Sequence, residues 1–341
     1  MISPQPPTTV APVSPRSRDL RHSGSLALSV AISAVLLVAL YSRIDLRAVA
    51  EVLRSSNPGW VVVSVGMIVP LIVLIAIRFR MTAPMGSLDS FGEALRLTLV
   101  ANALNLFLPS KLGDLVKSFF VAKRSRTTGS VAVAVIVYER LSDLFGLISF
   151  CLVGWLISGS MVTSVPSLTW LALAAVLAII IMLISSVRAA DLLIGCIKRL
   201  LPSRKLKTVR DLAEGWPSLH RALRGRRWRI ALLSLFLWFL HLTQIWLFTL
   251  AISAPVPLTV CFSLTALALL IGQIPFTFGG IGARDIALVT LLSGYIGAEA
   301  AAAVAILAMS RALLPPLAAL LIIRPYLSFA LEEAIRWKRK L

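Results

Sequence analysis

The chain has 341 residues, of which 58% are hydrophobic and only 14% are charged. Soluble domains contain roughly 45–50% apolar and about 25% charged residues, so a water-soluble globule could not bury this much apolar side chain. Lys and Arg number 34 against 15 Asp and Glu, which gives a formal net charge of +19. These values indicate an integral membrane protein that contacts an anionic leaflet. Binding to nucleic acid would require a soluble basic domain, and none is apparent in the sequence.

The first 25 residues are rich in Pro, Ser and Thr and become basic toward their end, which is typical of a disordered cytoplasmic tail. An apolar stretch, residues 26–42, follows this tail. A secretory signal peptide is the alternative interpretation, but no small-residue cleavage site follows the stretch, which runs on to Arg43, Asp45 and Arg47. We therefore predict an uncleaved first span.

A membrane crossing requires about 20 apolar residues. The candidates are residues 26–42, 60–77, 130–157, 168–187, 230–252 and 300–323. Two further apolar stretches are interrupted by Pro and Gly. Residues 94–108 break at 109–114 and resume over 115–122, and residues 258–274 break at 275–282 and resume over 286–295.

The resumed arms reach only about 12–15 Å at the helical rise per residue, so they cannot cross a hydrocarbon core of about 30 Å. We predict two re-entrant helical hairpins, with a pair of Pro-kinked ordinary spans as the alternative. The broken backbone must then face protein or a water-filled cavity, because lipid cannot satisfy its N–H and C=O groups.

The order of elements repeats: span, span, hairpin, span over about 26–160, and again over about 168–325. Three crossings per half would invert one half relative to the other, as in alternating-access transporters. The predicted fold class is therefore an all-α polytopic membrane protein, an inverted repeat with about six crossings plus two re-entrant helical hairpins.

The distribution of charge predicts the orientation of the chain. Residues 188–229 contain twelve Lys and Arg against three Asp and Glu. We expect this loop to be cytoplasmic together with the N-terminal tail and the basic tail 326–341, as the positive-inside rule requires. The loop is predicted to form two amphipathic helices, broken at Pro202 and Pro217, that lie on anionic lipid.

Charged side chains inside predicted spans are costly to bury and mark candidate functional positions. Glu139, Arg140 and Asp143 lie in one span, where an Arg140–Asp143 pair would neutralise two of the three charges. Arg311 lies in another span with no acid within one turn. Its partner must come from elsewhere, and the candidates are Glu139, Asp143, Asp114, Asp285 or a lipid phosphate.

The two hairpin breaks carry a second set of candidates. Gly279, Gly280 and Gly282 precede a helix start that bears Arg284 and Asp285. Backbone N–H groups that converge at such a start, with the positive end of the helix dipole, suit an anion, and Arg284 adds a guanidinium. The first break offers Lys111 and Asp114 in the same way. A plain tight turn is the alternative for each break.

The predicted substrate-binding set combines both groups of candidates. It consists of Lys111, Asp114, Glu139, Arg140, Asp143, Gly279, Gly280, Gly282, Arg284, Asp285 and Arg311. The glycine-rich break is not a nucleotide-binding P-loop, because the Lys-Ser/Thr ending is missing. The three cysteines have no metal-binding spacing, so we expect neither a cofactor nor a metal.

Four short patterns resemble those of a known family. They are Asn102-x-x-Asn105 with Lys111–Asp114, Glu139-Arg140-x-x-Asp143, the Gly279–Asp285 turn after Pro275, and Ser310-Arg311. Over roughly residues 25–325 the chain resembles the lysylphosphatidylglycerol synthase transmembrane region, a flippase-like, UPF0104-type family of integral membrane proteins. The resemblance implies a polytopic inner-membrane protein that moves a lipid between leaflets.

Two departures from the family pattern limit what the resemblance implies. Aminoacyl-lipid synthases in the family add a soluble domain that transfers an amino acid from tRNA to phosphatidylglycerol, and this sequence ends at Leu341 directly after the last span. The resemblance therefore does not carry over the synthase activity. Asp285 stands where the family usually has Glu, and Lys111 stands where it usually has Arg.

The leading hypothesis is a lipid flippase or transporter in the bacterial inner membrane, with both termini cytoplasmic, that moves an anionic or polyprenyl-linked lipid and is not an enzyme. Expected partners are that lipid, and a homo-oligomer or a separate cytoplasmic synthase. One alternative is a membrane-embedded enzyme or accessory subunit in glycolipid or cell-envelope lipid synthesis, with Glu139 or Asp143 as acid and base. Another is a scaffold that recruits a synthase through residues 188–229.

Overall fold

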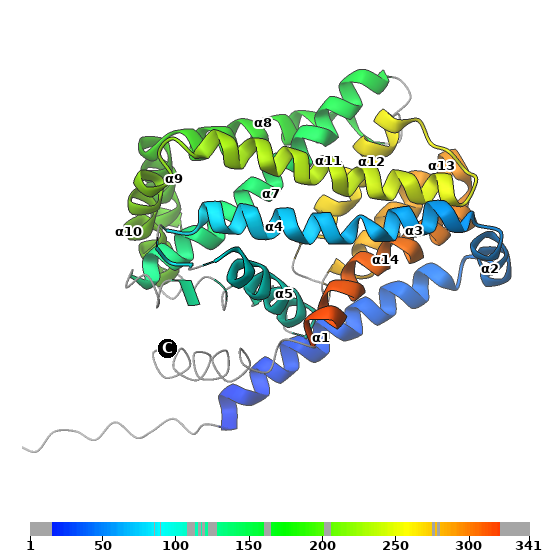
Figure 1. Ribbon diagram of the computed structural model, residues 1–341, viewed down its shortest axis with the longest axis horizontal. Helices are drawn as coiled ribbons and strands as arrows, with labels where there is room; N and C mark the ends of the chain where they lie inside the picture. The colour runs from blue at the N-terminus through cyan, green and yellow to red at the C-terminus, as the bar shows by residue number, and fades with distance from the viewer. Residues whose placement is uncertain are drawn as a thin grey trace, which may run out of the picture.

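The computed structural model of the chain describes residues 16–84, 86–88, 90–107, 113–114, 117, 120–121, 128–159, 165–200, 206–274, 277 and 280–320. Throughout this described part every regular element is a helix (Figure 1). The predicted all-α polytopic fold is confirmed. The predicted tail at residues 326–341 lies outside the described residues.

The helices at the predicted crossings are α1 (Arg16–Tyr41), α3 (Pro58–Gly66) with α4 (Ile68–Thr82), α7 (Gly129–Ser158), α8 (Ser167–Ser185), α11 (Arg227–Ala251) and α14 (Ala298–Leu320). Five of these, counting Pro58–Thr82 as one span, are long and apolar enough to cross a membrane. The sixth passes only as a bent pair, in which α1 from Leu28 onward meets α2 (Leu46–Arg54) at 86°. The Asp45 carboxylate caps α2 by accepting from the backbone N–H of Arg47.

The first helix is longer than the sequence predicts. It begins at Arg16, so residues 16–25, which we expected to belong to a disordered tail, are helical. Arg, Leu, His and Ser are tolerated in a helix at little cost, and Pro15 is the last residue before it that would break the helical hydrogen bonding. The composition of residues 1–15 therefore misled the assignment of the ten residues that follow.

The span formed by α3 and α4 has a local break. Pro70 lacks the N–H that would bond to the carbonyl of Gly66, and the two helices meet at Met67 beside that missing bond. Gly66 ends α3, and Pro70 lies on the exposed side of α4. The two pieces still form one continuous span of 25 residues.

The first interrupted stretch folds back on itself. α5 (Phe91–Phe107) is its first arm, and after it the backbone N–H of Gly113 donates to Asn105 Oδ1 at 2.9 Å. A Cβ at Gly113 would overlap the carbonyl oxygen of Ala101, so only glycine permits this return. Val121, in the second arm, is buried in a cluster with Ala94 near the start of α5. Both ends of this stretch therefore lie at the same end of the bundle, as a re-entrant hairpin requires.

The second interrupted stretch forms a helical pair, α12 (Leu258–Ile271) and α13 (Ala283–Ile296). Each helix has 14 residues and is about 21 Å long, which is too short for a hydrocarbon core of about 30 Å. A Cβ at Gly280 would lie 2.5 Å from the carbonyl oxygen of Gly272, so the turn folds directly onto the end of α12.

The two hairpins open at opposite ends of the bundle. The backbone N–H of Asn57, before α3, donates to the carbonyl of Ala251 at the end of α11 at 2.7 Å. α12 begins shortly after this point and α13 leads into α14 at the same end, beside α2 (Figure 1). The first hairpin opens where α4 ends, because Val121 and Ala94 cluster with Phe79. The two halves are therefore inverted, as the repeat predicts.

The basic loop forms α9 (Val187–Leu200) and α10 (Leu206–Ala222) at the end opposite α2 (Figure 1). The predicted break at Pro217 is wrong, because α10 continues through this residue. Trp216, Leu219 and Leu223 are buried against the bundle, and this packing offsets the backbone hydrogen bond that proline removes. The apolar face of α10 therefore contacts protein rather than lipid. Pro202 lies outside the described residues.

One polar contact joins α10 to the ends of two spans. Arg227, at the start of α11, donates from Nη1 to the carbonyl of Ser185 at the end of α8 at 2.8 Å. His220 Nε2 lies 2.7 Å from the same guanidinium nitrogen and 3.1 Å from the carbonyl oxygen of Ile184. Burial, and then the charge of Arg227, lower the pKa of His220. The folded protein therefore favours the neutral imidazole.

This contact predicts a pH dependence of stability. The histidine of the unfolded chain titrates near pH 6.5, so the contribution of His220 to the free energy of unfolding is fully present above that pH. This contribution is lost as pH falls through the lowered pKa of the folded state, because only the unfolded chain takes up the proton readily. We expect the thermal unfolding temperature in detergent to fall between about pH 7.5 and 5, and His220→Gln to flatten that dependence. Arg210→Gln, at an exposed position of α10, is the control; an unchanged slope in His220→Gln would contradict the assignment.

Candidate functional site

A cavity of about 300 Å³ lies inside the bundle and is bounded by both hairpins. Charged and polar residues of its wall come from both hairpins, α4, α7, α11 and α14. They are Arg78, Thr98, Asn102, Asn105, Asp114, Lys117, Glu139, Arg140, Asp143, His241, Gln244, Gln273, Arg284 and Arg311. Its apolar residues are Ile68, Leu71, Ile72, Ile75, Ala101, Leu237, Trp238, Ile281, Ala312, Pro315 and Pro316. The wall is therefore amphipathic.

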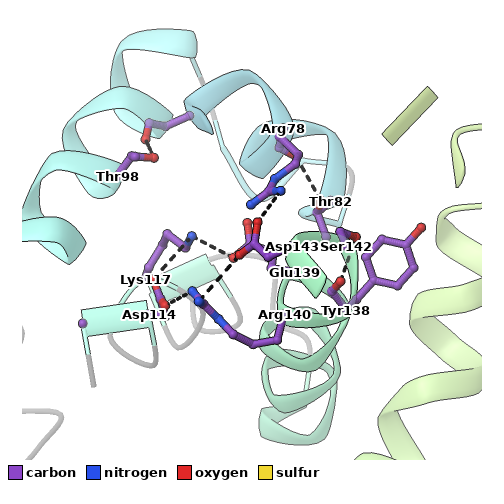
Figure 2. Close-up of polar contacts among 12 residues, drawn as sticks. Arg78, Thr82, Thr98, Asp114, Lys117, Tyr138, Glu139, Arg140, Ser142 and Asp143 are labelled. Carbon is purple, nitrogen blue, oxygen red and sulfur yellow. Dashed lines mark hydrogen bonds and ion pairs between the residues drawn. The ribbon is translucent and has the colours of Figure 1, made fainter. Parts of the chain in front are cut away.

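α7 carries three charged residues into this cavity, and each is ion-paired with another element (Figure 2). Lys117 Nζ lies 2.7 Å from Glu139 Oε2. Arg78 Nη1, from α4, lies 2.6 Å from Asp143 Oδ1. The predicted Arg140–Asp143 pair exists at 3.6 Å.

The main partner of Arg140 is nevertheless Asp114, which follows the turn of the first hairpin (Figure 2). The side chains of Lys117 and Glu139 are only 5% and 3% exposed, whereas that of Arg140 is 35% exposed. Buried charges must be paired to be tolerated. These ion pairs therefore hold the first hairpin and α4 against α7, and they leave Arg140 as the paired cation most open to a ligand.

The turn of the second hairpin uses its own carboxylate. Gly282 has φ +92°, a conformation that side chains disfavour, and its N–H donates to Asp285 Oδ2 at 2.9 Å. Arg284 Nη2 lies 2.8 Å from Asp285 Oδ1. The amide of Gly282, which we predicted to face an anion, is thus occupied by the cap of α13. Arg284 lines the cavity, whereas Asp285 is fully buried beside it.

Arg311 differs from the other cations of the cavity. Among the described residues no carboxylate lies within ion-pairing distance of its guanidinium, and its Nε is buried without a hydrogen-bond partner. Asp114, Glu139, Asp143 and Asp285, the four carboxylates that the sequence offered as partners, pair with other cations instead. The described part of the wall thus carries one unbalanced positive charge, on Arg311.

Sequence reasoning missed two charged residues of the site. Lys117 lies three residues after Asp114, a spacing that places both on one helical face, and this spacing could have identified it. Arg78 lies near the end of a span, where a basic residue is ordinarily a membrane-surface anchor, so the sequence carried no signal for it. Lys111 and Gly279, which the sequence placed in the site, lie outside the described residues. The substrate-binding role of the whole set stays a prediction.

Two polar residues of α11, His241 and Gln244, line the cavity. Gln244 Nε2 donates to the carbonyl of Ser64 in α3 at 2.7 Å and so joins the two helices. His241 lies 5.1 Å from Trp238, measured between ring centroids. These residues therefore fix the part of the wall that α11 contributes.

Comparison with known proteins identifies the family. The family model of the lysylphosphatidylglycerol synthase TM region matches residues 26–319. The chain belongs to this family.

Two curated relatives are similar over most of their length. A UPF0104 membrane protein from Methanothermobacter thermautotrophicus is 24% identical over 288 residues, which cover 78% of this chain and 84% of the relative. A UPF0104 membrane protein from Methanocaldococcus jannaschii is 23% identical over 295 residues, covering 81% and 87%. The resemblance found in the motifs is thus confirmed, and the family is one of lipid-related membrane proteins.

The buried pair of Lys117 and Glu139 predicts that removing either charge destabilises the protein strongly and that removing both destabilises it much less. Glu139→Gln or Lys117→Met alone leaves one buried charge without its partner and should cost roughly 3–5 kcal/mol. The double variant should recover most of that loss. Equilibrium unfolding in mixed detergent micelles measures all three. Glu214→Gln breaks an exposed pair with Arg210 and should cost less than about 1 kcal/mol; losses that simply add in the double variant would contradict the pairing.

Proposed function

We propose that the protein moves an anionic or polyprenyl-linked lipid between the leaflets of the membrane, with the head group passing through the cavity. The observation that carries this proposal is the unbalanced charge of Arg311. Arg311 lies in a membrane-spanning helix with its Nε buried, where a guanidinium is expensive without an anion, and the described wall offers it none. A lipid phosphate supplies the missing charge and accepts hydrogen bonds from the guanidinium.

The shape and chemistry of the cavity support a lipid ligand. A volume of about 300 Å³ is at the lower end for small-molecule sites, which suits a head group rather than a whole lipid. Ile68, Leu71 and Ile72 of α4 add apolar side chains to the same wall. Acyl chains could then stay in the bilayer while the head group sits beside Arg311.

The ion pairs suggest how binding couples to movement. Arg140 is shared between Asp114 and Asp143 and is the most exposed of the paired cations that line the cavity. A phosphate that attracts Arg140 would weaken its bond to Asp114, which is one of the two ion pairs that hold the first hairpin to α7. Because the two halves are inverted, the same cavity could then open toward the other leaflet. The sequence contains no nucleotide-binding motif, so we propose downhill or ion-coupled transport.

We propose transport rather than catalysis. Glu139 and Asp143, the two residues that the enzyme alternative would use as acid and base, each pair with a cation. That arrangement suits holding elements together better than transferring protons. Mass analysis of the recovered lipid separates the alternatives, because a transporter leaves its substrate chemically unchanged.

The role of Arg311 is tested by lipid translocation in vesicles. We expect Arg311→Leu to slow translocation of a fluorescent phosphatidylglycerol by about tenfold or more, since a charge-assisted hydrogen bond is worth about 1.5–3 kcal/mol. Arg311→Lys should restore part of the rate. Dithionite quenching of the outer leaflet measures both, and Arg210→Leu, at an exposed site on α10, is the control. Equal rates for wild type and Arg311→Leu would refute the proposal.

We further propose that the protein lies in the bacterial inner membrane with both termini in the cytoplasm. This orientation places the basic helices α9 and α10 inside, in agreement with the positive-inside rule. The connections at the opposite end, around α2 and between α11 and α12, carry far less positive charge.

The native cysteines provide a test of orientation. Cys196 of α9 is exposed, whereas Cys151 and Cys261 are buried. A membrane-impermeant maleimide should label Cys196 only after cells are permeabilised. Ser55→Cys, at the end of α2 and made with Cys196→Ala, should react in intact cells. The reverse pattern would show that the orientation is inverted.

A further inference from the structure

The cavity wall contains backbone acceptors next to Arg311 that arise from two consecutive prolines. In an α-helix each N–H donates to the carbonyl four residues earlier. Pro315 and Pro316 of α14 have no N–H, so the carbonyls of Arg311 and Ala312 lose their helical donors. All four residues line the cavity. The wall therefore combines a cation with two acceptors within one helical turn.

The two missing hydrogen bonds lie on the side of α14 that lines the cavity. Positions four apart share one face of a helix, which places Arg311 above Pro315 and Ala312 above Pro316. Both prolines are buried. Leu313, Leu314 and Leu317 are 41%, 40% and 56% exposed, so the lipid-facing side of α14 is a different one.

These carbonyls need a donor at membrane depth. Backbone groups that lose a hydrogen bond in an apolar environment are costly unless another group satisfies them. Among the residues that the structure describes, no side chain donates a hydrogen bond to the carbonyl of Arg311 or Ala312. A ligand whose phosphate pairs with Arg311 would bring its neighbouring atoms to the same turn of the helix.

We propose that Pro315 and Pro316 are specificity-determining residues that select head groups bearing hydrogen-bond donors beside the phosphate. The phosphate would pair with the Arg311 guanidinium, and a hydroxyl or ammonium group of the same head group would donate to the freed carbonyls. A phosphodiester of equal charge without such donors would pair with Arg311 but leave the carbonyls unsatisfied. This proposal rests on the proposed function, since it concerns the same cavity.

The test compares two lipids of equal charge and identical acyl chains, phosphatidylglycerol and phosphatidylmethanol, of which only the first has hydroxyl donors. Native mass spectrometry of the purified full chain with an equimolar mixture, distinguished by isotope, measures the preference directly. We expect wild type to prefer phosphatidylglycerol by about tenfold, equivalent to about 1.4 kcal/mol. Pro315→Ala with Pro316→Ala restores both helical donors, so the preference should disappear while phosphatidylmethanol binds as before.

Two variants separate this proposal from the proposed function. Pro70→Ala also restores a helical donor in a spanning helix, but Pro70 is exposed and outside the cavity wall, so the preference should persist. Arg311→Gln should weaken the binding of both lipids to the same extent. Equal binding of the two lipids to wild type, or a preference that survives in the double proline variant, would overturn only the proposed role of the prolines and not the proposed function. Binding of both lipids that is insensitive to Arg311→Gln would overturn the proposed function as well.

Discussion

The fold depends on the rule that charge and backbone polarity inside a membrane must be satisfied by the protein itself. α7 brings Glu139, Arg140 and Asp143 to membrane depth. The first two pair with the first hairpin and the third pairs with α4. Those pairs hold a broken hairpin and a neighbouring span in place around a cavity. The hydrocarbon core of the bilayer could supply none of these interactions, so the ion pairs decide where the short helices can lie.

Much of this architecture could be predicted from the sequence, because the membrane restricts the alternatives. Stretches of about 20 apolar residues identify spans directly, and their order revealed the inverted repeat. The arms of the broken stretches were too short to cross, and this geometric limit predicted hairpins. One failure occurred where tertiary packing decides the outcome, because α10 runs through Pro217 with its apolar face buried. The other arose from composition, because α1 extends back to Arg16 although the residues before it are typical of a disordered tail.

At the candidate site, too, some features could be predicted from the sequence and others depend on tertiary packing. Glu139, Arg140, Asp143 and Arg311 stood out because charge is rare within a span. Which acid meets which base could not be read from the chain, because the partners lie on different helices. Arg140 chooses Asp114, 26 residues away, over Asp143 on its own helix. Arg78 was overlooked for a different reason, because a basic residue near the end of a span is usually an anchor at the membrane surface.

The self-contained pair of Arg284 and Asp285 makes the two hairpins mechanically unequal. Neighbours in sequence on α13, these two residues neutralise each other, so displacing the tip of the second hairpin separates no opposite charges among the described residues. Displacing the first hairpin, by contrast, pulls Lys117 from Glu139 and Asp114 from Arg140. The tip of the second hairpin can therefore move at little electrostatic cost. The first hairpin can leave α7 only when other charges compensate those of its broken ion pairs.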